Sequence, residues 1–255
     1  MWHEERYNRI RHLLGTSGQV SVERIVEELK VSRETVRRDL LALESLGEIQ
    51  RVHGGAVLVG EEPPIDVRAA TRVREKQAIA REVVRLVGNG QTVFLDAGTT
   101  TSIIAEALAG LRGLLVITNS LAVARTLGTG RAGQHDNHVH LLGGSFNAEL
   151  SSTHGAATVA EIQRYQANVA ILSPVGIDAT AGASSQLLEE AEVARAMAVN
   201  ARHTIIAADH AKIGLRSRVA YCPCDAIGTL VTNGRARQAA AMHGVAQAVA
   251  EVVYA

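Results

Sequence analysis

The stretch Ser32-Arg33-Glu34-Thr35-Val36-Arg37-Arg38-Asp39-Leu40 decides how the first part of this 255-residue chain folds. Val36, Leu40 and Leu43 recur at the spacing of one buried helix face. Ser32 precedes them at the position where a hydroxyl side chain caps a helix N-terminus. When the apolar residues turn toward a core, the arginines of the stretch face outward. The stretch therefore predicts a capped helix with a basic outer face.

Elements on either side complete a small domain. The apolar pattern predicts a first helix over 2–15, and Ser21 offers a cap for a second, short helix. Gly47 ends the helix of the quoted stretch, and strands are expected over 49–52 and 56–58. Three helices and a hairpin within about sixty residues predict a winged helix-turn-helix.

Charge is informative here through its distribution. The whole chain carries 26 basic and 26 acidic residues, and residues 1–53 contain nine of each. Lys30 and the arginines at 33, 37 and 38 nevertheless place four cations around the predicted helix against the outward acid Glu34. Charge alone would favour a solvated helix face. The cap, the preceding short helix and the following hairpin instead favour a helix that enters the DNA major groove.

A break in every pattern at Gly60-Glu61-Glu62-Pro63-Pro64 separates a second, larger part of the chain. We expect a DNA-binding domain over 1–58, a linker over 59–75 and an α/β domain over 76–255. In this domain apolar runs of strand length alternate with helical stretches, which predicts an open, largely parallel sheet with helices on both faces. The expected strands are 92–95, 114–118, 139–142, 169–172, 204–208 and 230–232, and the expected helices are 102–111, 121–127, 156–165 and 187–199.

A phosphate-binding turn is predicted where the first of these strands ends. Asp96 follows the strand, and Gly98-Thr99-Thr100-Thr101 leads into a helix whose free N–H groups and dipole would face an anion. The run matches neither the Walker loop nor G-x-G-x-x-G, which disfavours ATP and NAD. Strands that end near Asn119 and Gly144 converge on the same crevice in an open α/β sheet. Lys212, just beyond a later strand, supplies a cation.

The quoted stretch resembles the signature of the DeoR family of transcriptional regulators, whose recognition helix reads Thr-(Ile/Val)-Arg-Arg-Asp-Leu. The run Gly-Glu-Ile-Gln-Arg-Val-His-Gly-Gly-Ala over 47–56 is similar to the wing of that family. The resemblance implies DNA contacts from the helix and the wing. Asp39 is expected to be structural and paired with a nearby arginine, since phosphate repels a carboxylate. The DNA-binding residues that we expect are Ser32, Arg33, Thr35, Arg37, Arg38, Arg51 and His53.

The resemblance extends over the second domain and implies a sensor domain similar in fold to ribose-5-phosphate isomerase and CoA transferases. Two positions depart from the family pattern, because Ala194 replaces the usual lysine and Ala211 replaces a serine. These losses predict a different or less charged ligand, unless Arg195 compensates. The implied effector-binding residues are Asp96, Gly98, Thr99, Thr100, Asn119, Gly144 and Lys212.

The sequence thus predicts a DNA-binding regulator rather than an enzyme. We expect a repressor of a carbohydrate or polyol catabolic operon, released from double-stranded operator DNA by a small phosphorylated sugar or polyol. We also expect a homodimer or homotetramer that needs no cofactor. No apolar stretch reaches the roughly 18 residues of a membrane span, and the first residues lack the apolar core of a signal peptide. A cytoplasmic location with no membrane partner follows.

Three alternatives stay open at this point. An isomerase or transferase would need acid and base groups, for which Asp96, Glu190 and Lys212 are candidates. An activator or architectural DNA binder that ignores metabolites would bind DNA with an affinity that does not depend on any ligand. His135, His138 and His140 could supply metal ligands, but a polar loop is the favoured interpretation and we expect no metal site.

Overall fold

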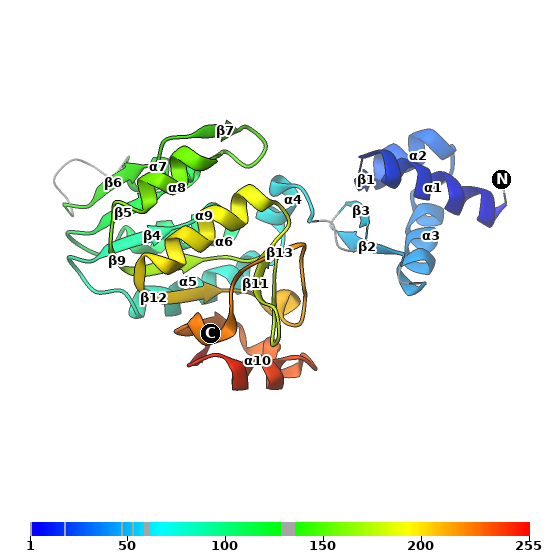
Figure 1. Ribbon diagram of the computed structural model, residues 1–255. Helices are drawn as coiled ribbons and strands as arrows, with labels where there is room; N and C mark the ends of the chain where they lie inside the picture. Colours follow the sequence, from blue (N-terminus) through cyan, green and yellow to red (C-terminus); the bar gives the residue numbers. More distant parts are fainter. Residues whose placement is uncertain (1, 18, 47, 53, 59–61, 129–135) are drawn as a thin grey trace. The chain divides into compact units, whose positions relative to one another are not determined.

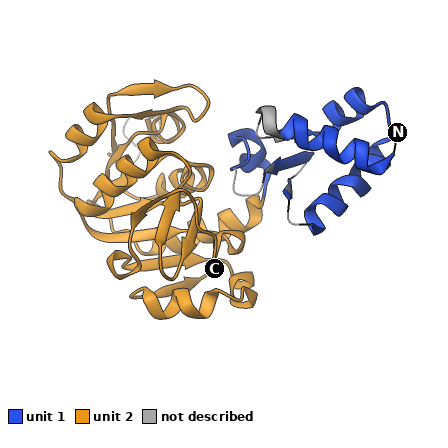
Figure 2. Cartoon of the chain, turned by 45° about the vertical axis from the view of Figure 1, so that its right-hand side comes forward, with its two compact units in different colours: residues 1–71 blue, residues 72–255 orange. Residues whose placement is uncertain are grey.

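The computed structural model describes residues 2–17, 19–46, 48–52, 54–58, 62–128 and 136–255. Its chain divides into two compact units, Met1–Thr71 and Arg72–Ala255, which are coloured separately in Figure 2. We call them unit 1 and unit 2 and describe each by itself. The expected linker over 59–75 contains a helix, α4 (Ile65–Ala70), which is the last element of unit 1.

Unit 1 is a winged helix-turn-helix. Three helices accompany an antiparallel sheet of order β1-β3-β2, in which β2 and β3 form the wing hairpin. The first strand was not predicted, because three residues are too few to show an alternating pattern. The elements are α1 (His3–Ser17), β1 (Gln19–Ser21), α2 (Val22–Leu29), α3 (Arg33–Ser45), β2 (Ile49–Val52) and β3 (Gly55–Leu58).

Both predicted helix caps are confirmed. The Ser21 hydroxyl accepts a hydrogen bond from the Arg24 N–H at 3.1 Å, and the Ser32 hydroxyl accepts one from the Thr35 N–H at 3.1 Å. Each bond satisfies an N–H group that the first helical turn leaves without a partner. The predicted apolar face of α3 is buried, together with apolar residues of α1, α2 and the sheet.

Unit 2 is built around a seven-stranded sheet of order β15-β14-β12-β9-β4-β5-β6 (Figure 1). All of its neighbouring strands run parallel, as the alternation of strands and helices predicted. Six of the strands were expected from the sequence and β15 was not. The strands are β4 (Thr92–Leu95), β5 (Leu115–Thr118), β6 (His138–Leu141), β9 (Ala167–Leu172), β12 (Ala201–Ala207), β14 (Thr229–Thr232) and β15 (Val252–Tyr254).

Alternate residues of the central strands enter two separate cores, one on each face of the sheet. Val93 and Leu95 pack with residues of α5, α6 and α7, whereas Phe94 packs with residues of α8 and α9. The expected α/β class with helices on both faces is therefore confirmed. The helices are α5 (Val73–Arg85), α6 (Thr99–Leu108), α7 (Leu121–Gly128), α8 (Ala156–Ile162) and α9 (Leu188–Val199).

Short elements that the sequence did not indicate complete unit 2. They form a β7-β8 hairpin, a sheet of order β10-β11-β13, and one short helix with three 3-10 turns. Most of these strands lack the apolar run that marks the strands of the large sheet. They are β7 (Ser145–Asn147), β8 (Ser152–His154), β10 (Gly176–Asp178), β11 (Gly182–Ser185), η1 (His210–Lys212), β13 (Val219–Cys222), η2 (Cys224–Ala226), η3 (Gly234–Gln238) and α10 (Met242–Ala248).

The strand order creates a topological switch point between β4 and β9. From β4 the sheet continues through β5 and β6 toward one edge, whereas β9, β12, β14 and β15 build the other half. In open parallel sheets, ligands bind outside the carboxyl ends of the strands at such a point. The residues that directly follow β4 and β9 are therefore the place to look for a ligand site.

Candidate DNA-binding helix and effector site

The outer face of α3 is basic. Arg33, Arg37 and Arg38 are exposed, and Thr35 is half-buried with its hydroxyl 2.9 Å from that of Ser32. Arg33 forms an exposed ion pair with Glu23 at 3.3 Å. In the part of the chain that the structure describes, no hydrogen bond or ion pair engages the side chains of Arg37 and Arg38. These two guanidinium groups are thus available to an external anion.

Asp39 lies on the buried side of the same helix. Its side chain is 5% exposed and accepts two hydrogen bonds from Arg6 of α1, from Nε at 2.6 Å and from Nη2 at 2.8 Å. This paired geometry is the strong form of the arginine–carboxylate contact. The expectation that Asp39 pairs with an arginine is confirmed, and the partner ties α3 to α1.

The wing holds Arg51 against α3. Its Nε lies 2.6 Å from Glu44 Oε2, and its backbone N–H donates to Glu44 Oε1 at 3.1 Å. The hydrogen bond from the Arg51 side chain is the main cause that lowers the pKa of Glu44. Gly55 lets the wing approach β1, because a Cβ there would collide with the Val20 carbonyl. His53, the other predicted wing contact, lies outside the described residues.

Asp96 stands at the switch point. It follows β4, and its Oδ2 accepts a hydrogen bond from the N–H of Ser173, which follows β9, at 3.0 Å. Its other oxygen, Oδ1, is buried and has no hydrogen-bond partner among the described residues. Burial raises the pKa of Asp96 to about 8, although the Ser173 N–H and the Lys212 charge oppose the rise. Near pH 7 this carboxyl is therefore largely protonated.

The predicted phosphate-binding turn opens α6. Gly98 is its N-cap residue and no side chain caps the helix. The hydroxyls of Thr101 and Ser102 donate to the Gly98 carbonyl, at 3.0 and 2.8 Å, rather than accepting from the helix. Thr100 is buried, and the Thr99 hydroxyl accepts a hydrogen bond from Lys76 Nζ at 2.9 Å. The turn thus presents backbone N–H groups, as expected, beside a lysine that the sequence did not single out.

Asn119 and Gly144 lie at the next strand ends but differ in what they offer. Asn119 donates from Nδ2 to the Thr153 carbonyl at 3.0 Å, and its Oδ1 is buried with no partner among the described residues. Gly144 has a φ of 140° and lies so close to Thr158 and His154 that a Cβ would collide with both. Packing by itself therefore requires a glycine at position 144.

Lys212 reaches the switch point from the end of β12. Its Nζ donates to Ser173 Oγ at 3.3 Å and to the Pro174 carbonyl. Tyr221, on β13, is buried near Asp96, and its hydroxyl has no hydrogen-bond partner among the described residues. Burial raises the pKa of Tyr221 well above its ordinary value, and the Asp96 charge adds to the rise. Sequence reasoning missed Tyr221, because β13 itself left no recognisable pattern.

Comparisons with known proteins agree with this architecture. Residues 6–62 match the DeoR-like helix-turn-helix domain, and residues 71–234 match the DeoR C-terminal sensor domain. The chain belongs to the DeoR family. Within this family, the winged helix-turn-helix is the DNA-binding domain of a transcriptional regulator.

Several curated relatives of this DeoR-family chain are repressors. The glycerol-3-phosphate regulon repressor of Escherichia coli is 36% identical over 84% of each chain. The transcriptional regulator GolR of Listeria innocua is 33% identical over 92% of each chain, and the repressor GlcR of Bacillus subtilis is 33% identical over 94% of this chain and 92% of its own. These relatives are regulators and not enzymes. Ribose 5-phosphate isomerase A from Neisseria gonorrhoeae, at 17% identity, covers 58% of this chain and 56% of its own with a TM-score of 0.40.

Two departures from the DeoR pattern can now be placed. Ala194 lies on the buried face of α9, whereas Arg195 is exposed and donates from Nη2 to the Ala220 carbonyl at 2.6 Å. Arg195 therefore does not stand where a lysine at position 194 would reach. Ala211 donates its N–H to Asp209 Oδ1 at 2.9 Å within η1. This backbone contact needs no hydroxyl at position 211.

The three histidines that suggested a metal site do not gather into one in the described part of the chain. His140 Nε2 lies 2.8 Å from Glu161 Oε1, and His135 falls outside the described residues. Over the described ranges, no group of three His, Cys, Asp or Glu side chains has the geometry to hold a metal ion. Within the same ranges, no helix combines the length and the apolar character that crossing a membrane requires.

The buried Asp96 predicts a pH dependence of stability. Its folded-state pKa of about 8 lies above the ordinary value of 3.8, so folding favours the protonated acid. The stabilisation is complete below about pH 4 and is lost as the pH rises through about 8, at up to about 1.4 kcal/mol per pKa unit. We expect Asp96→Asn, which is never ionised, to gain stability relative to the wild type over that range. Calorimetry at pH 5 and pH 8.5 measures the difference, and equal gains at both values would contradict the buried acid.

Proposed function

We propose that this DeoR-family regulator is a repressor of a carbohydrate or polyol catabolic operon, and that a small phosphorylated metabolite releases it from DNA. The observation that carries the proposal is the arrangement at the switch point, where Asp96 and Ser173 meet beside the uncapped start of α6. The names of the relatives support it, since several are repressors and one belongs to a glycerol-3-phosphate regulon. A three-carbon polyol phosphate is therefore the first compound to test.

In this proposal α3 and the wing bind double-stranded operator DNA. The exposed Arg37 and Arg38 would contact bases or phosphates in the major groove. Arg51 would exchange Glu44 for a backbone phosphate, which makes its contact weaker than that of a free arginine. The proposed DNA-binding residues are Ser32, Arg33, Thr35, Arg37, Arg38, Arg51 and His53.

The proposed effector lies outside the carboxyl ends of β4, β5 and β9. Backbone N–H groups at the start of α6 suit a phosphoryl group. The buried carboxyl of Asp96 and the buried amide oxygen of Asn119 suit hydroxyl groups, which can both donate and accept. Tyr221 joins the sequence-based set as a further hydroxyl partner. The proposed effector-binding residues from the sequence are Asp96, Gly98, Thr99, Thr100, Asn119, Gly144 and Lys212.

We also propose that the regulator works in the cytoplasm as a homodimer or homotetramer. One winged helix-turn-helix makes too little contact with DNA for a useful specificity ratio. Two copies of unit 1 on a symmetric operator double that contact. We propose no cofactor, metal or membrane partner.

The test of the proposed function follows DNA binding by unit 1 while candidate ligands of unit 2 are added. Fluorescence anisotropy of DNA from upstream of its own gene measures operator binding, and sugar and polyol phosphates are then added together with their unphosphorylated parents. We expect a specific complex that a phosphorylated compound dissociates and its parent does not. A complex that resists every compound favours the ligand-independent DNA binder, and turnover of a pentose phosphate favours the enzyme.

Operator binding is expected to depend on Arg37 and Arg38. Replacing either by alanine removes an exposed guanidinium and leaves the core of unit 1 intact, since both side chains are exposed. A bidentate arginine–guanine contact contributes about 1–3 kcal/mol, so affinity should fall by about 10- to 100-fold or more. Gel-shift titration measures the loss, with exposed Arg24→Ala on α2 as the matched control. Unchanged affinity in both variants would move the DNA-binding surface away from α3.

A further inference from the structure

Arg72 has an unusual backbone conformation at the boundary between the two units along the chain. It is the first residue of unit 2 and the N-cap residue of α5, and its φ of 52° and ψ of 39° lie in the left-handed region. Ser21, Ser32 and Asp209, which cap two other helices and the 3-10 turn η1, have the extended conformation that is usual at an N-cap. A bulky residue keeps left-handed angles only where its surroundings hold it there.

Arg72 is the joint between two helices. Thr71 and Arg72 alone separate α4 of unit 1 from α5 of unit 2. Thr71 is tied to α4, because its hydroxyl donates to the Val67 carbonyl at 2.6 Å and its N–H to the Arg68 carbonyl at 3.2 Å. The Arg72 carbonyl accepts a hydrogen bond from the Lys76 N–H of α5 at 3.0 Å. The φ and ψ angles of Arg72 therefore set the direction in which the chain passes from α4 to α5.

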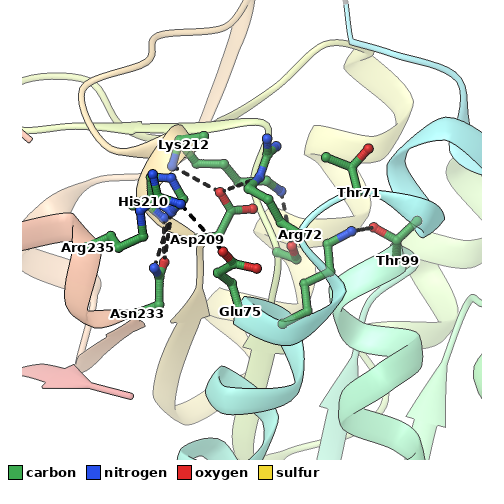
Figure 3. A network of polar contacts seen from close by, with 12 residues as sticks. Thr71, Arg72, Glu75, Thr99, Asp209, His210, Lys212, Asn233 and Arg235 are labelled. Carbon is green, nitrogen blue, oxygen red and sulfur yellow. Dashed lines mark hydrogen bonds and ion pairs between the residues drawn. The ribbon is translucent and has the colours of Figure 1, made fainter. Parts of the chain in front are cut away.

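A buried carboxylate holds Arg72 in this conformation. Its Nε lies 2.9 Å from Asp209 Oδ1 in an ion pair (Figure 3), and the Asp209 side chain is 1% exposed. Asp209 lies just beyond β12, where its Oδ1 also accepts a hydrogen bond from the Ala211 N–H at 2.9 Å. A carboxylate buried to this degree needs cations and hydrogen bonds to offset its lost hydration. The pair therefore opposes any change of backbone angles that would carry the Arg72 side chain away.

The turn η1 connects Asp209 to the switch point. Lys212, the last residue of this three-residue turn, donates from Nζ to Ser173 Oγ at 3.3 Å. Ser173 in turn lies beside Asp96 and close to Gly98, where an added Cβ would stand 3.9 Å from the Ser173 Cβ. The Lys212 N–H donates to the Asp209 carbonyl at 2.9 Å, which ties the two ends of the turn together. A ligand that displaces Lys212 at the switch point therefore also displaces Asp209.

We propose that the Arg72–Asp209 ion pair couples ligand binding at the switch point to DNA binding by unit 1. While the pair is formed, it holds Arg72 in the left-handed conformation. A ligand that moves η1 breaks the pair, Arg72 relaxes to more common backbone angles, and the chain then passes from α4 to α5 in another direction. Hinges concentrate a conformational change in a few dihedral angles in this way. This inference rests on the proposed function and adds the route by which the ligand acts.

The first experiment compares Arg72→Gly with Arg235→Ala in the full chain. Glycine adopts left-handed angles without strain, so Arg72→Gly removes the ion pair and spares the backbone. Arg235→Ala removes the neighbouring pair with Glu75, whose atoms lie 3.8 Å apart (Figure 3), and keeps Arg72. Fluorescence anisotropy gives operator affinity with and without glycerol 3-phosphate. We expect the compound to weaken operator binding at least about 10-fold in the wild type and in Arg235→Ala, and less than about 2-fold in Arg72→Gly.

Titration calorimetry distinguishes a loss of coupling from a loss of ligand binding. Coupling is reciprocal, so operator DNA weakens the binding of glycerol 3-phosphate to the wild type by the same factor. We expect Arg72→Gly to bind the compound at least as tightly as the wild type, with an affinity that operator DNA no longer changes. Asp209→Asn should behave in the same way, and the double variant should lose nothing further. Wild-type coupling in Arg72→Gly, or weaker binding of the compound by it, would overturn the proposal.

A measurement on the wild type does not depend on whether a variant folds. Hydrogen exchange followed by mass spectrometry reports how often backbone hydrogen bonds open. We expect glycerol 3-phosphate to speed exchange over residues 72–77, because Arg72 is released there. Operator DNA favours the paired state, so it should slow exchange over 72–77 and over 209–213, which lie in unit 2. Operator binding that leaves both segments unchanged would overturn the proposal.

The outcomes also separate this inference from the proposed function. If a compound releases the operator equally from the wild type and from Arg72→Gly, the proposed function stands and this inference fails. If another phosphorylated compound than glycerol 3-phosphate releases the wild type, it takes the place of glycerol 3-phosphate in each titration. If no compound does, the proposed function fails, and the exchange of 72–77 and 209–213 on operator binding alone decides whether Arg72 and Asp209 connect the two units.

Discussion

Asp39→Ala is expected to unfold unit 1 at temperatures where the wild type is folded. The substitution leaves the Arg6 guanidinium, whose side chain is 15% exposed, without the carboxylate that accepts two of its hydrogen bonds. Removing one partner of a buried ion pair costs about 3–5 kcal/mol. A domain of this size has about 4–10 kcal/mol of total stability, so the loss is a large fraction. Calorimetry of the full chain should show the unit 1 transition shifted to lower temperature, and operator binding should fall with it.

A double variant separates the charge imbalance from the loss of contact. Arg6→Met combined with Asp39→Leu replaces the ion pair by two apolar side chains and leaves no charge buried. Such replacements are often neutral or stabilising, so we expect the double variant to recover much of the lost stability. Arg38→Ala, an exposed change in the same helix, should leave the transition in place. A wild-type melting temperature for Asp39→Ala would show that the Arg6–Asp39 ion pair does not stabilise unit 1.

Thr99→Asp is expected to abolish the response to the effector. The new carboxylate stands at the first position of α6 and within reach of Lys76, since the present hydroxyl lies 2.9 Å from its Nζ. It therefore occupies the place that we propose for the effector anion, and it repels a phosphoryl group. We expect an affinity for glycerol 3-phosphate reduced at least about 100-fold, or about 2.7 kcal/mol. Titration calorimetry measures this, and anisotropy follows the operator complex.

Thr99→Asn is the matched control, because its side chain has the same size as aspartate and no charge. It should retain most of the affinity for the effector and continue to release the operator. Thr99→Asp should still bind DNA, in either a permanently occupied or a permanently empty state, but the effector should no longer change that binding, because a ligand acts only through differential affinity for two states. An effector that stabilises both variants equally would place its anion elsewhere.

Most of unit 1 could be predicted because its signals are local. Ser21 and Ser32 cap helices whose apolar positions repeat clearly, and the turn residues of the wing follow at once in the sequence. The pairing of Asp39 followed from charge and helix position, but its partner did not. Arg6 lies 33 residues away, and contacts at that separation leave no pattern in a single sequence.

The candidate site of unit 2 was predictable only where its residues follow apolar strands of the parallel sheet. Asp96 and Asn119 come directly after such strands, so topology alone brings them together. Lys76 resembles any other lysine of an amphipathic helix, because only the packing of α5 on α6 buries it. Tyr221 lies on a four-residue strand whose register depends on neighbours from a distant part of the chain.

The three apolar cores have a consequence for how regulators of this family can diversify. In the described ranges the core of unit 1 draws its members from residues 7–56, and the two cores of unit 2 draw theirs from residue 79 onward. A substitution that changes operator specificity therefore leaves the cores of unit 2 unchanged. A substitution that changes ligand specificity leaves the core of unit 1 unchanged. Operator specificity and ligand specificity can therefore evolve under separate selection. Gene fusion or exchange of whole domains can join an existing DNA-binding domain to a sensor domain with a new ligand. The short segment from α4 to the start of α5 connects the two units along the chain, so it has to be compatible with both of them.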